Sequence, residues 1–539
     1  MTLTHMPSGS KRSRKSKRAT PSAASVPQIA RFTLSKKWTW VILAVILTIA
    51  ASLRFSGLEA APPGLYIDEA ADGANAVQAW ESGDFRVFYP EDNGREGLYT
   101  NVASVFIHVL GSNARALRLP AAIFGFLTVA GLYALASELI SVPVALAAAF
   151  FLATSYWHLN FSRMAFRAIA APCFLVWALY LLLFAFRRRR GRADFAVWAA
   201  LAGVLYGLGF QTYIAYRVTP ILMILVLGFL FAEAWRGGWM RRYWITAGLF
   251  TLGTVATAYP LVSYLLSHPG TANNRVNQVS IFDSPNLEQD IETNTWATIG
   301  MLYWHGDTNP RHNYPGRPEV FWPVSVLMTL GAAIALWKMF TRWSPAAWLA
   351  PVLLLVWIAC GAAPAILSNE GLPHALRSIL MLPPVMLLAG IGAAGSLSLV
   401  SRRIPLRVLT AAVIALACAL VGETGYTYFY LWAKDPSTPQ SFSPKEVHLA
   451  AEINSLPPGQ AKVVAIQGPI EASDPFYPPL LPLRFLTRSV TLQQQEKSNL
   501  RFYTPLTFPV PLSGGAQNGD FCSQAKAALP NTIVVCVAL

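Results

Sequence analysis

Charged residues are scarce in this chain. Asp, Glu, Lys and Arg together make up 13% of its 539 residues, whereas hydrophobic residues make up 54%. An ordinary soluble domain carries about 25% charged residues. The composition therefore indicates a membrane protein.

Cysteine is also scarce, and its spacing excludes the common cysteine-based metal sites. Cys173, Cys360 and Cys418 lie within apolar stretches, while Cys522 and Cys536 lie near the C-terminus. On an oxidising side of a membrane the last two would form a disulfide, and otherwise they would stay free thiols. The sequence leaves both alternatives open.

Acidic residues are outnumbered by basic ones, 27 to 42, which gives a formal charge of +15. In a soluble protein this excess would suggest a nucleic-acid partner, but here Lys and Arg cluster at the ends of apolar runs. No Gly-rich nucleotide-binding loop stands outside those runs. We therefore expect no nucleic-acid partner and attribute the basicity to membrane topology.

Long apolar runs are abundant. A helix of about 20 apolar residues crosses the hydrocarbon of a bilayer, and the first candidate, which starts at Trp38, has a cleaved signal peptide as its alternative. We prefer an uncleaved anchor because the run is long and no clear cleavage site follows it. The sequence predicts about eleven transmembrane helices, at residues 38–55, 116–136, 143–158, 168–186, 195–213, 215–234, 243–266, 321–340, 346–367, 375–399 and 406–430.

The charge pattern orients these spans and divides the chain. Residues 1–37 form a basic tail predicted to be disordered and cytoplasmic, and the connections RRRRGR, WRGGWMRRYW, KMFTRW and SRRIPLR lie on the same face. Residues 38–432 form the transmembrane domain, and its outer loops 56–115 and 267–320 hold 15 of the 27 acidic residues. Residues 433–539 follow as a small extracytoplasmic α/β domain with short β-like runs. The fold class is thus an α-helical polytopic membrane protein whose active site lies in the two outer loops.

The first outer loop begins with GLYIDEAADG, which places Asp68 and Glu69 just beyond the first span. In an extended segment these adjacent side chains diverge, so one can face a substrate as a base while the other orients the backbone or binds a cation. The alternative is a solvated acidic turn.

Further along this loop, Asp92, Arg95, Glu96 and Tyr99 lead into a short amphipathic stretch that ends at Gly111. The stretch is too short to span a bilayer and predicts an interfacial helix in the outer leaflet. Alternatively, Arg95 and Glu96 only snorkel at the interface.

Cationic side chains recur at the outer ends of the spans. Arg163 and Arg167 lie between the third and fourth spans, and His374 and Arg377 begin the tenth. A cation at this depth needs a partner, and a lipid phosphate, which the planar guanidinium of Arg contacts through two oxygens, is available there. Snorkelling or pairing with protein carboxylates is the alternative.

The second outer loop contains WHGDTNPRHNYPGRP, which is dense in polar and aromatic residues. Such side chains bind sugar hydroxyls, and Trp304 or Tyr314 would stack on a pyranose. Alternatively, the loop is a folded cap whose polar groups bond its own backbone. His305 and His312 alone do not indicate zinc. The candidates for sugar or acceptor binding here are Asp307, Asn309, Arg311, His312 and Asn313.

The order of these segments resembles the C superfamily of membrane glycosyltransferases, and especially bacterial family 39 proteins, lipid A aminoarabinose transferases and protein O-mannosyltransferases. The resemblance rests on a first span, Asp68-Glu69, the REGLY segment at 95–99 and RALRLPAAIFGFLTVAGLYALASEL. It continues through HLNFSRMAFRA, GFQTYIAYRVTP, DTNPRHNYPGRP and HALRSILMLPP.

The resemblance implies an inverting transfer of a sugar from a polyprenyl-phosphate donor to a glycan, lipid or protein acceptor, outside the bacterial plasma membrane. Asp68 would be the catalytic base, and Glu96 would shape the site or bind a metal. Arg95, Arg163, Arg167, His374 and Arg377 would bind the donor phosphate. From the matched segments we assign Tyr99, His158 and Tyr213 to the sugar or acceptor.

Two departures from the family pattern bear on these expectations. Gly97 stands where many relatives have Pro, and Ala168, Ile169 and Ala170 stand where relatives often carry an acidic residue. No cofactor is therefore assigned, although a divalent metal ion stays possible. The alternative functions are a flippase for lipid-linked glycans and a ligase or polymerase that uses polyprenyl-diphosphate glycans.

Overall fold

The computed structural model describes residues 34–91, 94–187, 192–270, 277–341, 345–510 and 521–538. Most of the predicted basic tail lies outside these ranges, as do Asp92 and most of the RRRRGR run. Parts of the KMFTRW connection also lie outside them.

The membrane region is a bundle of long apolar helices. Within the described ranges, nine helices are long and apolar enough to cross a membrane, and a tenth candidate is the pair α5–α6, bent by 57°. The protein is thus a polytopic membrane protein. The helices of the bundle are α1 (Lys36–Phe55), α4 (Ala114–Leu139), α5 (Val142–Ala153), α6 (Tyr156–Arg163), α7 (Ala170–Arg187), α8 (Arg192–Gly209), α9 (Pro220–Gly237), α10 (Met240–Ser267), α13 (Trp322–Thr341), α14 (Pro345–Ile366), α15 (Leu382–Val400) and α16 (Leu406–Tyr426).

Two predicted spans differ from the structure. The span expected at 195–213 coincides with α8, which is apolar but shorter than the other candidates. The span expected at 143–158 breaks where Ser155 caps a new helix by accepting a hydrogen bond from the His158 N–H. The predicted number of eleven therefore stays unconfirmed.

The first outer loop folds into α2 (Ile67–Ser82), β1 (Phe88–Tyr89), β2 (Arg95–Glu96) and α3 (Leu98–Leu110). The prediction of an extended segment at Asp68 and Glu69 was wrong, because both lie in the first turn of α2. The Glu69 side chain accepts the Tyr66 N–H at 3.1 Å, and carboxylates are favourable at a helix N-terminus. These two effects start the helix here.

Gly97 makes the turn between β2 and α3 possible. A Cβ at this position would lie 2.0 Å from the Arg86 carbonyl oxygen, and the Gly97 N–H donates to the Val87 carbonyl at 2.8 Å. A proline would clash and would lose this hydrogen bond. The local backbone therefore explains why glycine stands here.

The second outer loop contains α12 (Leu287–Gly300), which precedes the polar segment 301–320. Asn294 of this helix donates to the carbonyls of Ile366 and Ser368 at 2.8 and 2.9 Å. These bonds fasten the loop to the end of α14.

The C-terminal part contains a three-stranded parallel sheet in the order β4-β3-β5. Cys522 of α21 and Cys536 of β5 form a disulfide, so the structure has the paired alternative. The elements after α16 are α17 (Ser437–Gln440), α18 (Pro444–Ser455), β3 (Lys462–Gln467), α19 (Leu481–Leu486), α20 (Leu492–Lys497), β4 (Leu500–Tyr503), α21 (Phe521–Ala528) and β5 (Ile533–Ala538).

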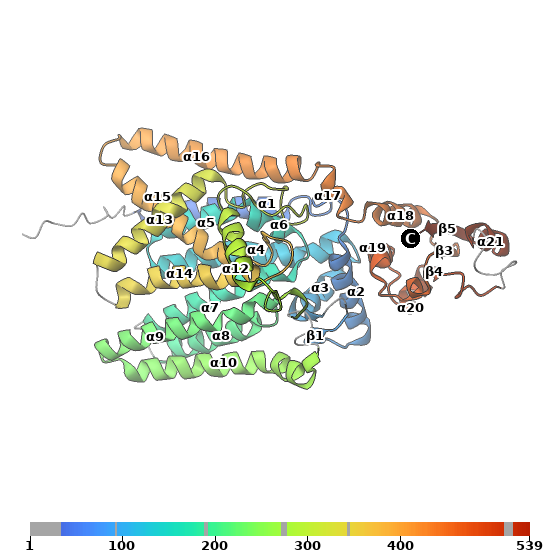
Figure 1. The fold of residues 1–539 in the computed structure, drawn as a ribbon, viewed down its shortest axis with the longest axis horizontal. Helices are drawn as coiled ribbons and strands as arrows, with labels where there is room; N and C mark the ends of the chain where they lie inside the picture. Colours follow the sequence, from blue (N-terminus) through green and yellow to red (C-terminus); the bar gives the residue numbers. More distant parts are fainter. Residues whose placement is uncertain are drawn as a thin grey trace, which may run out of the picture.

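This C-terminal domain lies beyond the end of the helical bundle that carries α2 and α3, and the connection between α9 and α10 lies at the opposite end (Figure 1). Its contact with α2 is close, since a Cβ at Gly73 would meet the Phe485 ring at 2.6 Å. Nearby, the Leu65 N–H donates to the Phe442 carbonyl at 3.0 Å. The two outer loops and the C-terminal domain therefore gather at one end of the protein.

Candidate active site

Glu69 is part of the scaffold. Its carboxylate is fully buried and accepts both Nε and Nη2 of Arg118 at 2.9 Å. The Ala165 N–H, at 2.8 Å, is a further donor. A carboxylate with all these donors has no free face for a substrate, so the geometry argues against the predicted catalytic role of Glu69. The remaining donors of Arg118 bond the carbonyls of Leu58, Pro62 and Gly64.

Asp68 lies on the same turn but is only half-buried. Its carbonyl oxygen accepts Arg95 Nη1 at 3.3 Å, and Arg95 also pairs with Asp72 at 3.4 Å. Thr100 donates to the same oxygen of Asp72 at 3.0 Å. Arg95 is 2% exposed, and its contacts fix the first turn of α2 on β2 and α3. Such a buried side chain offers no surface to the donor phosphate, in contrast to the prediction from the sequence.

Glu96 joins two arginines. It accepts Arg167 Nε at 3.3 Å and Arg217 Nη2 at 3.4 Å. The Glu96 side chain is 3% exposed, whereas those of Arg167 and Arg217 are 22% and 32% exposed. The two partly exposed arginines share a single carboxylate. The cluster therefore has an excess of positive charge that can bind an anion. Arg167 also lies 6.0 Å from the ring centre of Tyr213, which places this predicted residue beside the cluster.

Sequence reasoning missed Arg217. It lies in η2 (Ile214–Val218), just before the apolar run of α9, and thus occupies the same kind of position as Arg163 and Arg167. A cation at the start of an apolar span was the signal that was available.

Three other predicted contacts belong to the interior. Arg163 donates to carbonyls at the end of α1 and in the turn after it, those of Leu53, Arg54, Gly57 and Ala61. His158 is fully buried, with Nδ1 2.7 Å from Arg54. Tyr99 is 1% exposed and donates to the Leu117 carbonyl at 2.9 Å. A buried polar group needs a hydrogen-bond partner, and these three side chains find theirs within the protein. We therefore assign all three to the scaffold and not to ligand binding.

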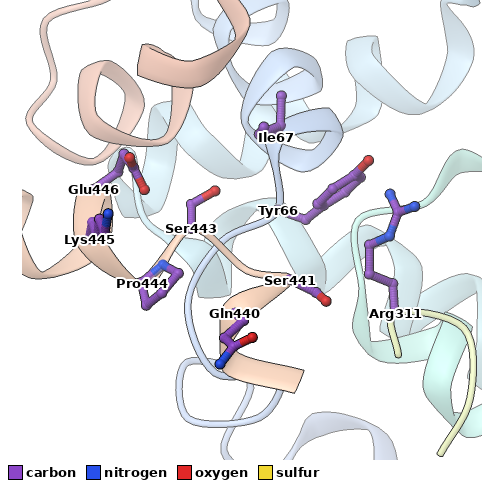
Figure 2. A pocket seen from close by; sticks show the side chains of 9 residues that line it. All are labelled: Tyr66, Ile67, Arg311, Gln440, Ser441, Ser443, Pro444, Lys445 and Glu446. Atoms are coloured by element: carbon purple, nitrogen blue, oxygen red, sulfur yellow. The ribbon is translucent and has the colours of Figure 1, made fainter. Parts of the chain in front are cut away.

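A groove of about 550 Å³ lies at Tyr66 and Ile67, the two residues that precede Asp68 in the chain (Figure 2). Arg311 lies 4.3 Å from the ring centre of Tyr66, and Asn309 orients it by accepting Arg311 Nε at 3.1 Å. The other side of the groove comes from the segment that leads into α18, which the sequence did not single out. The lining residues are Tyr66, Ile67, Arg311, Gln440, Ser441, Ser443, Pro444, Lys445 and Glu446.

The remaining predicted residues lie in two loops that meet. Asp307 Oδ2 lies 2.9 Å from His312 Nδ1, and one ligand atom from each of Asp307, His312 and His374 lies within 4.8 Å of the others. Asn313 is buried and bridges the carbonyls of Asp307 and Arg317, as expected for a folded cap.

Arg377 and Glu319 are two further charged side chains of these two loops. Arg377 pairs with the half-exposed Glu370 at 2.9 Å. Burial raises the pKa of the Glu319 carboxyl well above its usual range, and the neighbouring Asp307 carboxylate raises it further.

Comparisons with known proteins bear on the family and on the fold. The family model described as dolichyl-phosphate-mannose-protein mannosyltransferase matches residues 98–264. The structure of ArnT from Cupriavidus metallidurans bound to undecaprenyl phosphate matches with a TM-score of 0.51 and 13% identity, over 93% of this chain and 90% of that one. The Archaeoglobus fulgidus oligosaccharyltransferase in complex with Zn and sulfate has a TM-score of 0.48 and 13% identity, over 86% of this chain and 62% of that one. No curated protein sequence matches the chain significantly.

Proposed function

We propose, from the family match over residues 98–264 and the fold shared with ArnT, that the chain transfers a sugar from a polyprenyl-phosphate donor to an acceptor with inversion at the anomeric carbon. The observation that carries the proposal is the half-buried Asp68 at the start of α2, held by Arg95 in the same outer loop that presents the Glu96 cluster. The bound lipid of the ArnT structure supports the donor class.

In the proposed reaction, Asp68 accepts the proton of an acceptor hydroxyl or amine as that group attacks the anomeric carbon. The bond from this carbon to the phosphate oxygen breaks, and the polyprenyl phosphate leaves with the electron pair. A single displacement inverts the configuration, through a transition state that resembles an oxocarbenium ion as in glycoside hydrolysis.

Arg167 and Arg217 stabilise the charge that develops on the departing phosphate. Both side chains are partly exposed, and guanidinium groups bind phosphate through paired hydrogen bonds. Arg163, which the sequence favoured for this role, instead donates hydrogen bonds to backbone carbonyls. His374 and Arg377 lie on the neighbouring loop, where we keep them as candidates for contact with the donor.

We place the acceptor in the groove between Tyr66 and α18. It contains hydroxyl and amide groups from Ser441, Ser443 and Gln440 together with two cations, a mixture that suits a polar glycan or a headgroup. Tyr66 and Ile67, which line the groove, directly precede Asp68 in the chain, and on this basis we place the acceptor near the base.

The orientation of the chain follows from charge and redox chemistry. The basic connections predict the cytoplasmic face, and a disulfide in the C-terminal domain fits an oxidising compartment. We therefore propose that the active site faces the outside of a bacterial plasma membrane.

Asp68→Asn is the direct test. We expect transfer of labelled sugar from a polyprenyl monophosphate to fall by about 10²- to 10⁴-fold, while the apparent unfolding temperature in the same lipid stays unchanged. Asp84→Asn is the matched control, because Asp84 lies in the same loop and its side chain is 56% exposed. Full turnover in Asp68→Asn would remove this residue from the base role.

Donor specificity separates the alternatives. Transfer from polyprenyl-diphosphate glycans but not from monophosphates would indicate a ligase or polymerase. Movement of lipid-linked glycan across the bilayer without transfer would indicate a flippase. The buried Arg54, Arg118 and Arg163 speak against a polar pathway, because they bond protein carbonyls and carboxylates.

A further inference from the structure

Asp307 connects two loops that are distant in sequence. Its Oδ1 accepts the Asn309 N–H at 2.8 Å within its own loop. Its Oδ2 accepts the Ala375 N–H at 2.9 Å, 68 residues along the chain, and lies at 2.9 Å from His312 Nδ1. These bonds bring His312 and His374 together, with their ring centres 4.9 Å apart.

Two members of this cluster are buried, and two aromatic rings flank it. Asp307 is 3% and His312 is 5% exposed, and the rings of Phe161 and Phe166 lie 5.7 and 6.3 Å from the His312 ring. Weak competition from water strengthens the interaction of charged ligands with a cation.

Asn160 holds the backbone of the cluster. Its Nδ2 donates to the carbonyls of Arg311 and His312 at 3.0 and 2.7 Å. Its Oδ1 is buried and has no hydrogen-bond partner among the described residues. Since buried amide oxygens are normally paired, this oxygen is an available acceptor beside the cluster.

We propose that Asp307, His312 and His374 bind one divalent transition-metal ion of the zinc type. Two imidazole nitrogens and one carboxylate oxygen suit zinc, cobalt or nickel, whereas magnesium and calcium prefer oxygen ligands only. Three protein ligands leave a fourth position open, as in zinc sites that bind water or substrate.

The distances are compatible with such an ion. Metal–ligand bonds of about 2.0–2.1 Å in a tetrahedral site place neighbouring ligand atoms roughly 3.3 Å apart. Asp307 Oδ2 and His312 Nδ1 are 2.9 Å apart, and the three ligand atoms lie within 4.8 Å of one another. A small opening of the first pair and a rotation of the half-buried His374 ring complete the site.

The ion would act on the groove through Arg311. This residue precedes His312 and stacks on Tyr66, two residues before Asp68. Binding of the ion would fasten segment 305–319 to the loop that precedes α15 and thereby fix Arg311. The site is independent of the proposed transfer reaction, so metal binding itself is the readout.

Cobalt is the probe, because its visible absorption reports coordination geometry. Tag-free protein in detergent is treated with a chelator, freed of it, and titrated with Co²⁺. We expect one equivalent to bind with the spectrum of a four-coordinate nitrogen–oxygen site, and Zn²⁺ to displace it. His374→Gln and Asp307→Asn should raise the apparent Kd for Co²⁺ by more than about 100-fold. Loss of a residue that only hydrogen-bonds a metal ligand raises the Kd by about 10- to 100-fold.

His305→Gln is the matched control, because His305 is exposed in the same loop and should leave cobalt binding unchanged. Zn²⁺ should raise the unfolding temperature of the wild type and of His305→Gln, but not that of His374→Gln. The half-exposed His374 is the deciding variant if a change at the buried His312 prevents folding. Absence of stoichiometric binding, or equal binding by His374→Gln and the wild type, would overturn the proposal and leave a metal-free Asp–His hydrogen bond.

Discussion

Two groups of arginines at the outer ends of the spans behave in opposite ways. Arg118 and Arg163 are fully buried, and their donors go to backbone carbonyls and to Glu69. Arg167 and Arg217 share Glu96 and keep 22% and 32% of their side chains exposed. A buried guanidinium bonded to carbonyls joins helices, whereas one that retains exposed donors can bind an anion.

The comparison also separates the two acidic residues at the start of α2. Glu69 is enclosed with Arg118, while Asp68 on the same helical turn stays half-buried. Removing one partner of a buried ion pair leaves an uncompensated charge, which costs far more than the loss of an exposed pair. Stability and activity should therefore respond to different substitutions.

The largest expected effect is that of Glu69→Gln. The substitution leaves Arg118 buried without its counter-charge, so we expect a loss of about 3–5 kcal/mol in the free energy of unfolding. The measurement is the apparent unfolding temperature and the monodisperse yield in detergent. Glu91→Gln is the control, since its pair with Arg86 is partly exposed and should cost no more than about 1 kcal/mol. Wild-type stability in Glu69→Gln would show that the distinction between buried and exposed pairs fails here.

Next in size is the loss of activity in Arg167→Gln and Arg217→Gln. Each removes a charged hydrogen bond of about 1.5–3 kcal/mol, so sugar transfer should fall roughly 10- to 100-fold. Each should leave the unfolding temperature close to that of the wild type, because Glu96 keeps the other arginine. Arg163→Gln should do the reverse and lower stability first. If Arg163→Gln folds normally and loses only transfer, the assignment of the two groups must be exchanged.

The smallest expected effect is that of Lys445→Ala in the groove. Lys445 is exposed, and an exposed charge contributes about 0.2–1 kcal/mol. We expect the KM for the acceptor to rise about two- to fivefold without a change in kcat. Lys497→Ala, a lysine of the same domain outside the groove, is the control. An altered KM for the donor but not for the acceptor would move the acceptor away from this groove.

The membrane class and most spans were readable from the sequence because hydropathy is a local property of about 20 consecutive residues. The superfamily resemblance was confirmed by the family match and the fold of ArnT. The position of Asp68 in the loop that follows the first span was predicted by the same local reasoning. The conformation there did not, because the Tyr66–Glu69 cap depends on how the loop packs.

The sequence by itself determined that this is a polytopic membrane protein with many of its acidic residues in loops 56–115 and 267–320 and with cations at the ends of its spans. Only the tertiary structure decided which arginines donate to backbone carbonyls and which pair with Glu96. It alone brought His374 to Asp307 across 66 intervening residues, and Lys445 to the groove lined by Tyr66 and Ile67. The physical reason is that charge and hydropathy are carried by single residues, whereas burial and hydrogen-bond partners arise from contacts between distant segments.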